Sequence, residues 1–196
     1  MRYLIFILSL FVLACGSPEE ITFDNKYIDL IKGDDIVFED GSSISMPTTD
    51  STKIYYLIRH AEKDTSTSTN NPLLTEEGYN RSYRLAEIFK QTRIDQIYST
   101  LYNRTLHTVD SLGNTKGLST QIYMPNALKK VAQEMEDNVN AKRFVIVGHS
   151  DSTPAFSNVI MGEQTFEQGF DHSDYDNLVV IVKSPEKAKI YKLRYH

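Results

Sequence analysis

From about residue 54 onward, short apolar runs alternate with stretches whose apolar positions recur at helical spacing. Strand-length runs rich in β-branched and aromatic residues predict strands at 54–58, 96–98, 120–123 and 144–147. Helical spacing of apolar residues predicts helices at 75–91, 104–112, 127–139 and 153–161. The runs at 178–182 and 189–193 flank a Ser-Pro-Glu turn and predict a closing hairpin.

This alternation of strands and helices favours an α/β fold. Parallel strands joined by helices need helices on both faces of the sheet. We therefore expect a three-layer α/β/α domain over residues 54–196, with a mostly parallel central sheet and the C-terminal hairpin as an antiparallel edge. Thr75 is positioned to cap the first helix, and Gly113 to end the second.

The first 15 residues have the pattern of an export signal. Arg2 precedes an apolar run at 3–13, which is followed by Ala14 and Cys15. Val12-Leu13-Ala14-Cys15 resembles a bacterial lipoprotein box, in which the cysteine is lipidated. The resemblance implies an exported cell-envelope lipoprotein, attached to the membrane by its lipid anchor only. An ordinary secretory signal, with an incidental Cys15, is the alternative.

Residues 16–53 are polar and rich in residues that favour turns, which predicts a tether between the anchor and the domain. The apolar run at 36–38 is long enough for one short strand within it.

Composition narrows the range of functions. The net charge is −5, so no basic field favours nucleic acid, and any anion site must be built locally. Cys15 is the one cysteine, which excludes an internal disulfide and a cysteine zinc cluster. We expect no metal and no cofactor.

The candidate chemistry lies where predicted strands end. Arg59 and His60 follow the strand at 54–58, His149 follows that at 144–147, and Arg104 comes shortly after 96–98. Ligands of open α/β sheets bind beyond the carboxyl ends of the strands, so these side chains are expected to converge. Arginine matches phosphoryl oxygens, and a neutral imidazole can attack phosphorus. A second, protonated imidazole would stabilise the developing charge.

Four segments in order resemble the histidine phosphatase superfamily, which has the phosphoglycerate mutase-like fold. They are Leu57-Ile58-Arg59-His60-Ala61-Glu62-Lys63, Leu74-Thr75-Glu76-Glu77-Gly78, Tyr98-Ser99-Thr100 with Arg104-Thr105 and Thr108, and Val147-Gly148-His149-Ser150. The resemblance implies that His60 is a nucleophile and that Arg59, Arg104 and His149 complete a phosphate pocket. It further implies metal-independent hydrolysis of phosphate monoesters through a phosphohistidine.

The residue that protonates the leaving group is left open between Asp151 and Glu62. Asp151 lies two residues after His149, but it also precedes a predicted helix that it could cap. The substrate is expected to be a phosphorylated small molecule or a phosphoprotein, with specificity set by loops 64–72 and 164–176. His172 lies in the second of these loops, in an acidic stretch expected to be solvated.

Two alternative functions remain. The segment Gly148-His149-Ser150-Asp151-Ser152 partly resembles the nucleophile elbow of serine hydrolases, with Ser150 as nucleophile. That interpretation leaves Arg59 and His60 unexplained. A non-catalytic phosphate-binding lipoprotein on the same fold is the second alternative.

Overall fold

The computed structural model describes residues 19–196, so Cys15 and the predicted signal lie outside the described residues. The strands are β1 (Glu19–Lys32), β2 (Asp35–Phe38), β3 (Ser43–Ser45), β4 (Lys53–Arg59), β5 (Gln96–Ser99), β6 (Thr120–Ile122), β7 (Arg143–Gly148), β8 (Asn177–Lys183) and β9 (Ala188–Arg194). The helices are α1 (Glu76–Ile88), α2 (Asn103–Lys116), α3 (Leu128–Asp137) and α4 (Ser152–Met161).

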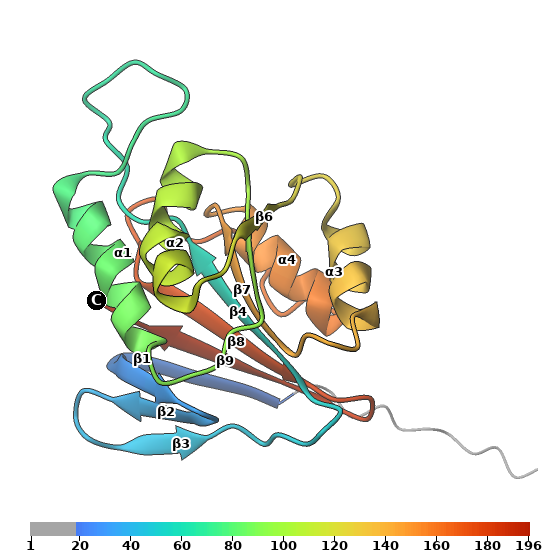
Figure 1. Cartoon of the computed structure of the whole chain (residues 1–196). Helices are drawn as coiled ribbons and strands as arrows, with labels where there is room; N and C mark the ends of the chain where they lie inside the picture. Colours follow the sequence, from blue (N-terminus) through green and yellow to red (C-terminus); the bar gives the residue numbers. More distant parts are fainter. Residues whose placement is uncertain (1–18) are drawn as a thin grey trace, which may run out of the picture.

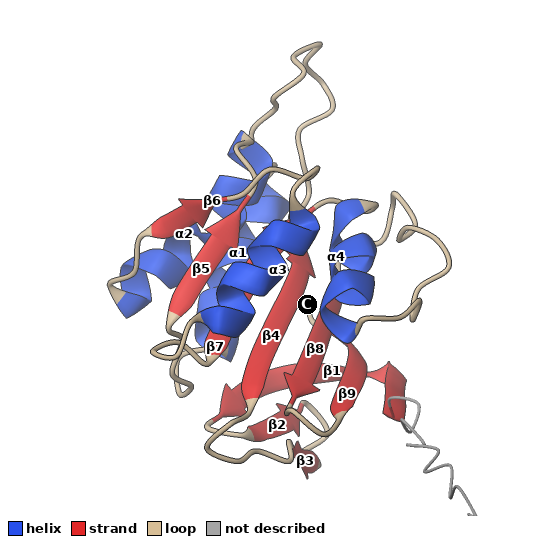
Figure 2. Ribbon diagram, turned by 90° about the vertical axis from the view of Figure 1, so that its right-hand side faces the viewer, coloured by secondary structure: helices blue, strands red, loops and turns tan. Residues whose placement is uncertain are grey.

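The predicted three-layer architecture is confirmed. Helices α1 and α2 cover one face of the sheet, and α3 and α4 cover the other (Figures 1 and 2). Successive side chains of β4 pack against opposite helical layers, because side chains alternate between the two faces of a strand. Tyr56 belongs to the hydrophobic cluster that includes Leu85 and Val109, whereas Leu57 belongs to the cluster that includes Phe156.

Strand order creates a crevice at one end of the sheet. The sheet formed by residues 19–196 runs β3-β2-β1-β9-β8-β4-β7-β5-β6. β4, β7, β5 and β6 are parallel, and β7 lies between β4 and β5 although it follows both in the chain. After β4 the chain continues to α1 on one face of the sheet. After β7 it continues to α4 on the other face. Such divergence at a topological switch point opens a ligand-binding crevice beyond the strand ends.

Of the two helix ends assigned to a specific residue, one is confirmed and one is wrong. The Thr75 hydroxyl accepts a hydrogen bond from Gly78 N (3.1 Å), which confirms the predicted cap of α1. The prediction that the second helix ends at Gly113 is wrong. Helix α2 continues to Lys116 and ends at Gly117, which has φ of 65°. A Cβ at Gly113 would lie 3.1 Å from Leu118 O, so glycine here permits a close approach within the helix end.

The prediction that residues 16–53 form a tether is also wrong for most of its length. β1 pairs in parallel with β9, and β2 and β3 continue the sheet as antiparallel strands. The C-terminal hairpin is therefore internal to the sheet, because β1 covers the side of β9 that was expected to be an edge. Within residues 19–196, no helix has the length and apolar character needed to cross a bilayer.

Burial of β1 gives a direct stability test. Ile31 is fully buried in the cluster beneath α1. We expect Ile31→Ala to lower the free energy of unfolding by about 2–5 kcal/mol, from lost burial and a residual cavity. Urea denaturation followed by circular dichroism measures this. The neighbouring Lys32→Ala, at an exposed position, should change stability by no more than about 0.5 kcal/mol. If both substitutions had equally small effects, the result would support the interpretation of this segment as a tether.

Candidate active site

His60 lies directly beyond the end of β4, with its ring in a defined orientation. Its backbone N–H donates to Gly148 O (2.9 Å), and its Nδ1 is 2.8 Å from Ala61 O. A carbonyl can only accept, so Nδ1 carries the proton and Nε2 keeps its lone pair. Burial lowers the pKa of the His60 imidazole to about 3, and the neighbouring Arg59 and Arg104 act in the same direction. The ring is therefore neutral, with Nε2 available as a nucleophile.

His149 follows β7 and lies beside His60, with 5.5 Å between the ring centroids. Its Nδ1 is 3.4 Å from Arg104 Nη2, and its Nε2 is 3.0 Å from Thr100 Oγ1. Arginine can only donate, so Nδ1 accepts and Nε2 carries the proton. Burial, followed by the charge of Arg104, lowers the pKa of His149 to about 4. Both observations favour a neutral His149 that orients Arg104, and a protonated imidazole beside a phosphoryl group stays a prediction.

Arg59 is almost fully buried and binds a distant loop. Nη1 donates to Asp171 O and Asp174 O (both 2.7 Å), and Nη2 donates to His172 O (2.9 Å). The Tyr175 ring stacks on the guanidinium, 4.1 Å from its carbon. Arg59 thus contributes charge to the site and holds the loop at 171–175 in place.

These residues line one cavity of about 520 Å³. Its lining brings together Arg59, His60, Arg104, His149 and Asp151 from the sequence prediction, with Lys63, Tyr102, Pro125, Ser150, Ser152 and His172. The predicted convergence of strand ends is confirmed for Arg59, His60, Arg104 and His149.

Sequence reasoning missed three polar side chains of this cavity. Lys63 is the last residue of the segment that contains His60. Its place in that segment could have identified it as a residue of the site. The Tyr102 ring lies against the Arg104 guanidinium, with 4.4 Å between the ring centroid and Cζ. No sequence pattern predicts this contact. His172, which was expected in a solvated loop, is exposed and lines the cavity.

The two predicted proton-donor candidates have different surroundings. The Glu62 carboxylate is bound by Arg81, whose Nε lies 2.9 and 3.0 Å from its two oxygens, and it lines a different cavity. The structure therefore does not bring Glu62 to His60. Asp151 lines the cavity of His60, but its carboxylate caps α4 by accepting from Ser152 N (2.7 Å).

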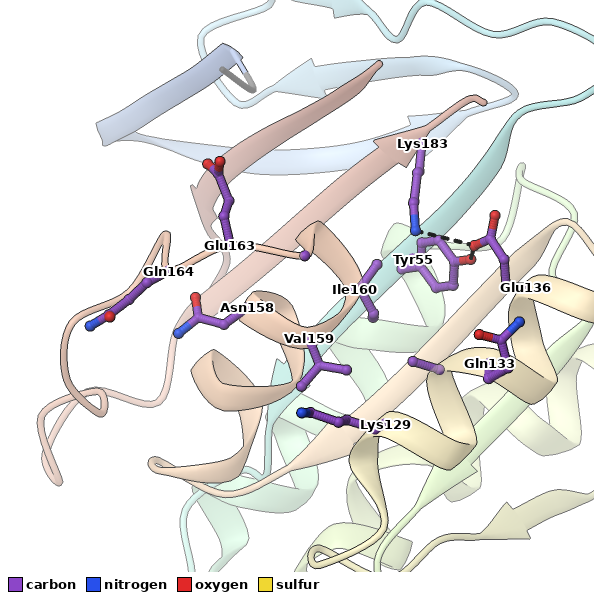
Figure 3. Close-up of a pocket in the computed structure, with 12 residues that line it drawn as sticks. Tyr55, Lys129, Gln133, Glu136, Asn158, Val159, Ile160, Glu163, Gln164 and Lys183 are labelled. Carbon is purple, nitrogen blue, oxygen red and sulfur yellow. Dashed lines mark hydrogen bonds and ion pairs between the residues drawn. The ribbon is translucent and has the colours of Figure 1, made fainter. Parts of the chain in front are cut away.

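A larger cavity of about 670 Å³ lies between α3 and α4, away from His60 (Figure 3). There, the Tyr55 hydroxyl donates to Glu136 Oε2 (2.9 Å), and Lys183 Nζ lies 3.5 Å from the same oxygen. No arginine or histidine is among the described residues that line it. The cavity of His60 is smaller, but it brings histidines together with Arg59 and Arg104. Within residues 19–196, no group of three or more His, Cys, Asp or Glu side chains is arranged to hold a metal ion.

Comparisons with known proteins agree with this geometry. Residues 55–126 match the model of the histidine phosphatase superfamily (branch 1), a segment that includes His60 and Arg104. No curated protein sequence matches the chain.

Several solved structures share the fold. A proposed phosphohistidine phosphatase SixA from Agrobacterium tumefaciens aligns with a TM-score of 0.54 and 19% identity, covering 72% of this chain and 96% of that chain. A proposed α-ribazole-5'-P phosphatase from Escherichia coli K-12 aligns with a TM-score of 0.58 and 12% identity. The alignment covers 72% of this chain and 96% of that chain. A mycobacterial glucosyl-3-phosphoglycerate phosphatase aligns with a TM-score of 0.52 and 14% identity, covering 74% and 100%.

The resemblance to the histidine phosphatase superfamily is therefore confirmed. The matched segment contains His60 and Arg104, and the fold is shared by phosphoglycerate mutase-like phosphatases.

Neutrality of the two buried histidines is testable by NMR. With lowered pKa values of about 3 and about 4, neither imidazole should gain a proton between about pH 8 and about pH 5. The ¹⁵N shifts of the ring nitrogens should keep the proton on Nδ1 of His60 and on Nε2 of His149. Loss of each signal in His60→Gln and His149→Gln assigns them. Titration of either signal near pH 6.5, the ordinary histidine value, would contradict the burial argument.

Proposed function

We propose that this chain is a phosphatase that hydrolyses phosphate monoesters through a phosphohistidine on His60. The observation that carries the proposal is the neutral, buried His60 ring, whose Nδ1–H is held by Ala61 O and whose Nε2 lone pair is free. An imidazole fixed in this tautomer is ready to attack without first losing a proton.

The charges around the cavity suit a phosphoryl group. Lys63, Arg59 and Arg104 supply three cations against the single carboxylate of Asp151, in a protein whose net charge is −5. The Nε–H groups of Arg59 and Arg104 are buried and have no acceptor among the described residues. A buried unpaired donor costs about 1–3 kcal/mol, which an anionic oxygen bound in the cavity would recover.

The proposed reaction has two steps. His60 Nε2 attacks phosphorus in line, the bond between phosphorus and the ester oxygen breaks, and the leaving oxygen takes up a proton. Water then attacks the phosphohistidine, the P–N bond breaks, and inorganic phosphate and neutral His60 are released. Lys63 and Arg104 stabilise the equatorial oxygens in both steps, the role that a metal ion has in other phosphoryl-transfer enzymes.

A serine hydrolase centred on Ser150 is the competing enzyme class, and one contact favours it. Ser150 Oγ lies 3.3 Å from His172 Nδ1, as in a nucleophile–base pair. The second nitrogen of His172 has no carboxylate partner among the described residues, so the third member of a triad is not seen there. The competing interpretation also assigns no role to His60 or Arg104.

The substrate class is a phosphate monoester of a small molecule or a protein. The similar structures, at identities of 12–19%, are named as phosphatases of phosphohistidine, α-ribazole-5'-P and glucosyl-3-phosphoglycerate. We place the phosphoryl group among Arg104, Lys63 and His60. The remainder of the substrate would extend toward the loop that contains His172.

Removing the nucleophile tests the proposal. Wild-type protein should hydrolyse p-nitrophenyl phosphate, and His60→Ala should lower kcat by about 10³-fold or more. Brief incubation with ³²P-labelled substrate should leave an acid-labile label on wild type only. Ser150→Ala should still form the label, and chelator should leave the rate unchanged. His107→Ala, outside the cavity, is the matched control. Phosphate binding without turnover at any pH would support a non-catalytic binding protein instead.

We further propose that the chain is exported and anchored in the bacterial cell envelope by a lipid on Cys15. The proposal rests on Arg2, the apolar run at 3–13 and the box ending at Cys15. Full-length protein expressed in a Gram-negative host should incorporate radiolabelled palmitate and partition with membranes. Cys15→Ser should lose both properties. A processed but unlabelled wild-type protein would indicate an ordinary secretory signal.

A further inference from the structure

His172, in the loop at 169–175, lines the cavity that contains His60. His172 Nδ1 lies 3.3 Å from Ser150 Oγ, and its Nε2 has no hydrogen-bond partner among the described residues. A third histidine therefore borders the cavity that contains His60 and His149. The reaction proposed above still requires a group that delivers a proton to the leaving oxygen.

The backbone of this loop is fixed from two sides. Arg59 donates to the carbonyls of Asp171, His172 and Asp174, so one bond holds the peptide of His172 itself. On the other side, Phe170 N donates to Ser150 O (2.7 Å).

Gly169 makes the second attachment possible. A Cβ at this position would lie 2.9 Å from Ser150 O, a contact too close for any other residue without movement of the loop. The position of His172 is thus set by the arginine beside the nucleophile and by the turn that follows β7.

The other acids near the cavity are poorly suited to proton donation. Glu62 is bound in a two-oxygen contact by Arg81 and lines a different cavity. The Asp151 carboxylate is engaged as the cap of α4, where it accepts from Ser152 N. Imidazole, in contrast, is the side chain that both holds and releases protons near neutral pH.

We propose that His172 is the general acid of this phosphatase, an inference that rests on the function proposed above. Protonated His172 donates from Nδ1 to Ser150 Oγ and transfers its Nε2 proton to the ester oxygen as the bond to phosphorus breaks. The leaving group departs as a neutral alcohol, and His172 becomes neutral. In the second step, Nε2 takes a proton from the attacking water. Ser150 is a positioning residue in this scheme.

The test compares esters whose leaving groups differ in their need for a proton. For an alkyl phosphate, whose leaving alkoxide is strongly basic, His172→Gln should lower kcat by about 10²–10⁴-fold, the usual contribution of a general acid. For p-nitrophenyl phosphate, whose leaving phenolate is stable without a proton, the loss should stay below about tenfold. His107→Gln makes the same substitution outside the cavity and should leave the ratio of the two rates unchanged.

Each other result overturns the assignment. Equal loss on both esters would make His172 a structural or substrate-binding residue, and no loss on either would remove it from the reaction. A selective loss on the alkyl ester in Asp151→Asn, with none in His172→Gln, would assign the acid to Asp151. His60→Ala separates this proposal from the one it rests on. If wild type cleaves both esters and His60→Ala cleaves neither, the proposed function stands whatever His172→Gln shows.

Discussion

The pairing of β4 with β7 is the constraint on which the rest of the site depends. In this parallel pair Arg59 lies opposite Gly148, and His60 N donates to Gly148 O (2.9 Å). Two histidines that are 89 positions apart in the printed sequence therefore leave the sheet side by side. Because the chain then continues to α1 on one face and to α4 on the other, a crevice opens beyond these two strand ends. A slip of either strand by one residue would turn the side chains of that strand to the opposite face of the sheet.

Desolvation gives these histidines their chemical form. Burial lowers the pKa of both rings, and the neighbouring arginine charges add to that effect. The same crowding of positive charge that would repel a protonated imidazole attracts a phosphoryl group. A neutral His60 ring and a cationic pocket are thus two results of one arrangement. His172 is exposed and lies outside this buried region.

Local patterns in the sequence predicted the fold from β4 onward and the core of the site, because strand ends and helix caps are properties of short segments. They did not predict β1. Its buried residues Ile28 and Ile31 are three apart, since the register of β1 against β2 shifts between Ile28 and Leu30. That irregularity breaks the alternation by which a half-buried strand is identified. Its partner β9 also lies at the far end of the chain, so the pairing has no local signal.

Arg59 shows why residue type alone could not assign every role. The sequence places an arginine beside the nucleophile, and the expectation was a ligand for phosphate. In the structure three of its bonds go to backbone carbonyls, which any loop sequence would offer. Its buried Nε–H has no acceptor among the described residues. One guanidinium can therefore place a charge beside the phosphoryl group and also fix the loop that holds His172. Arg59 adjoins His60 in the chain and also binds this loop, so a change at Arg59 would affect both.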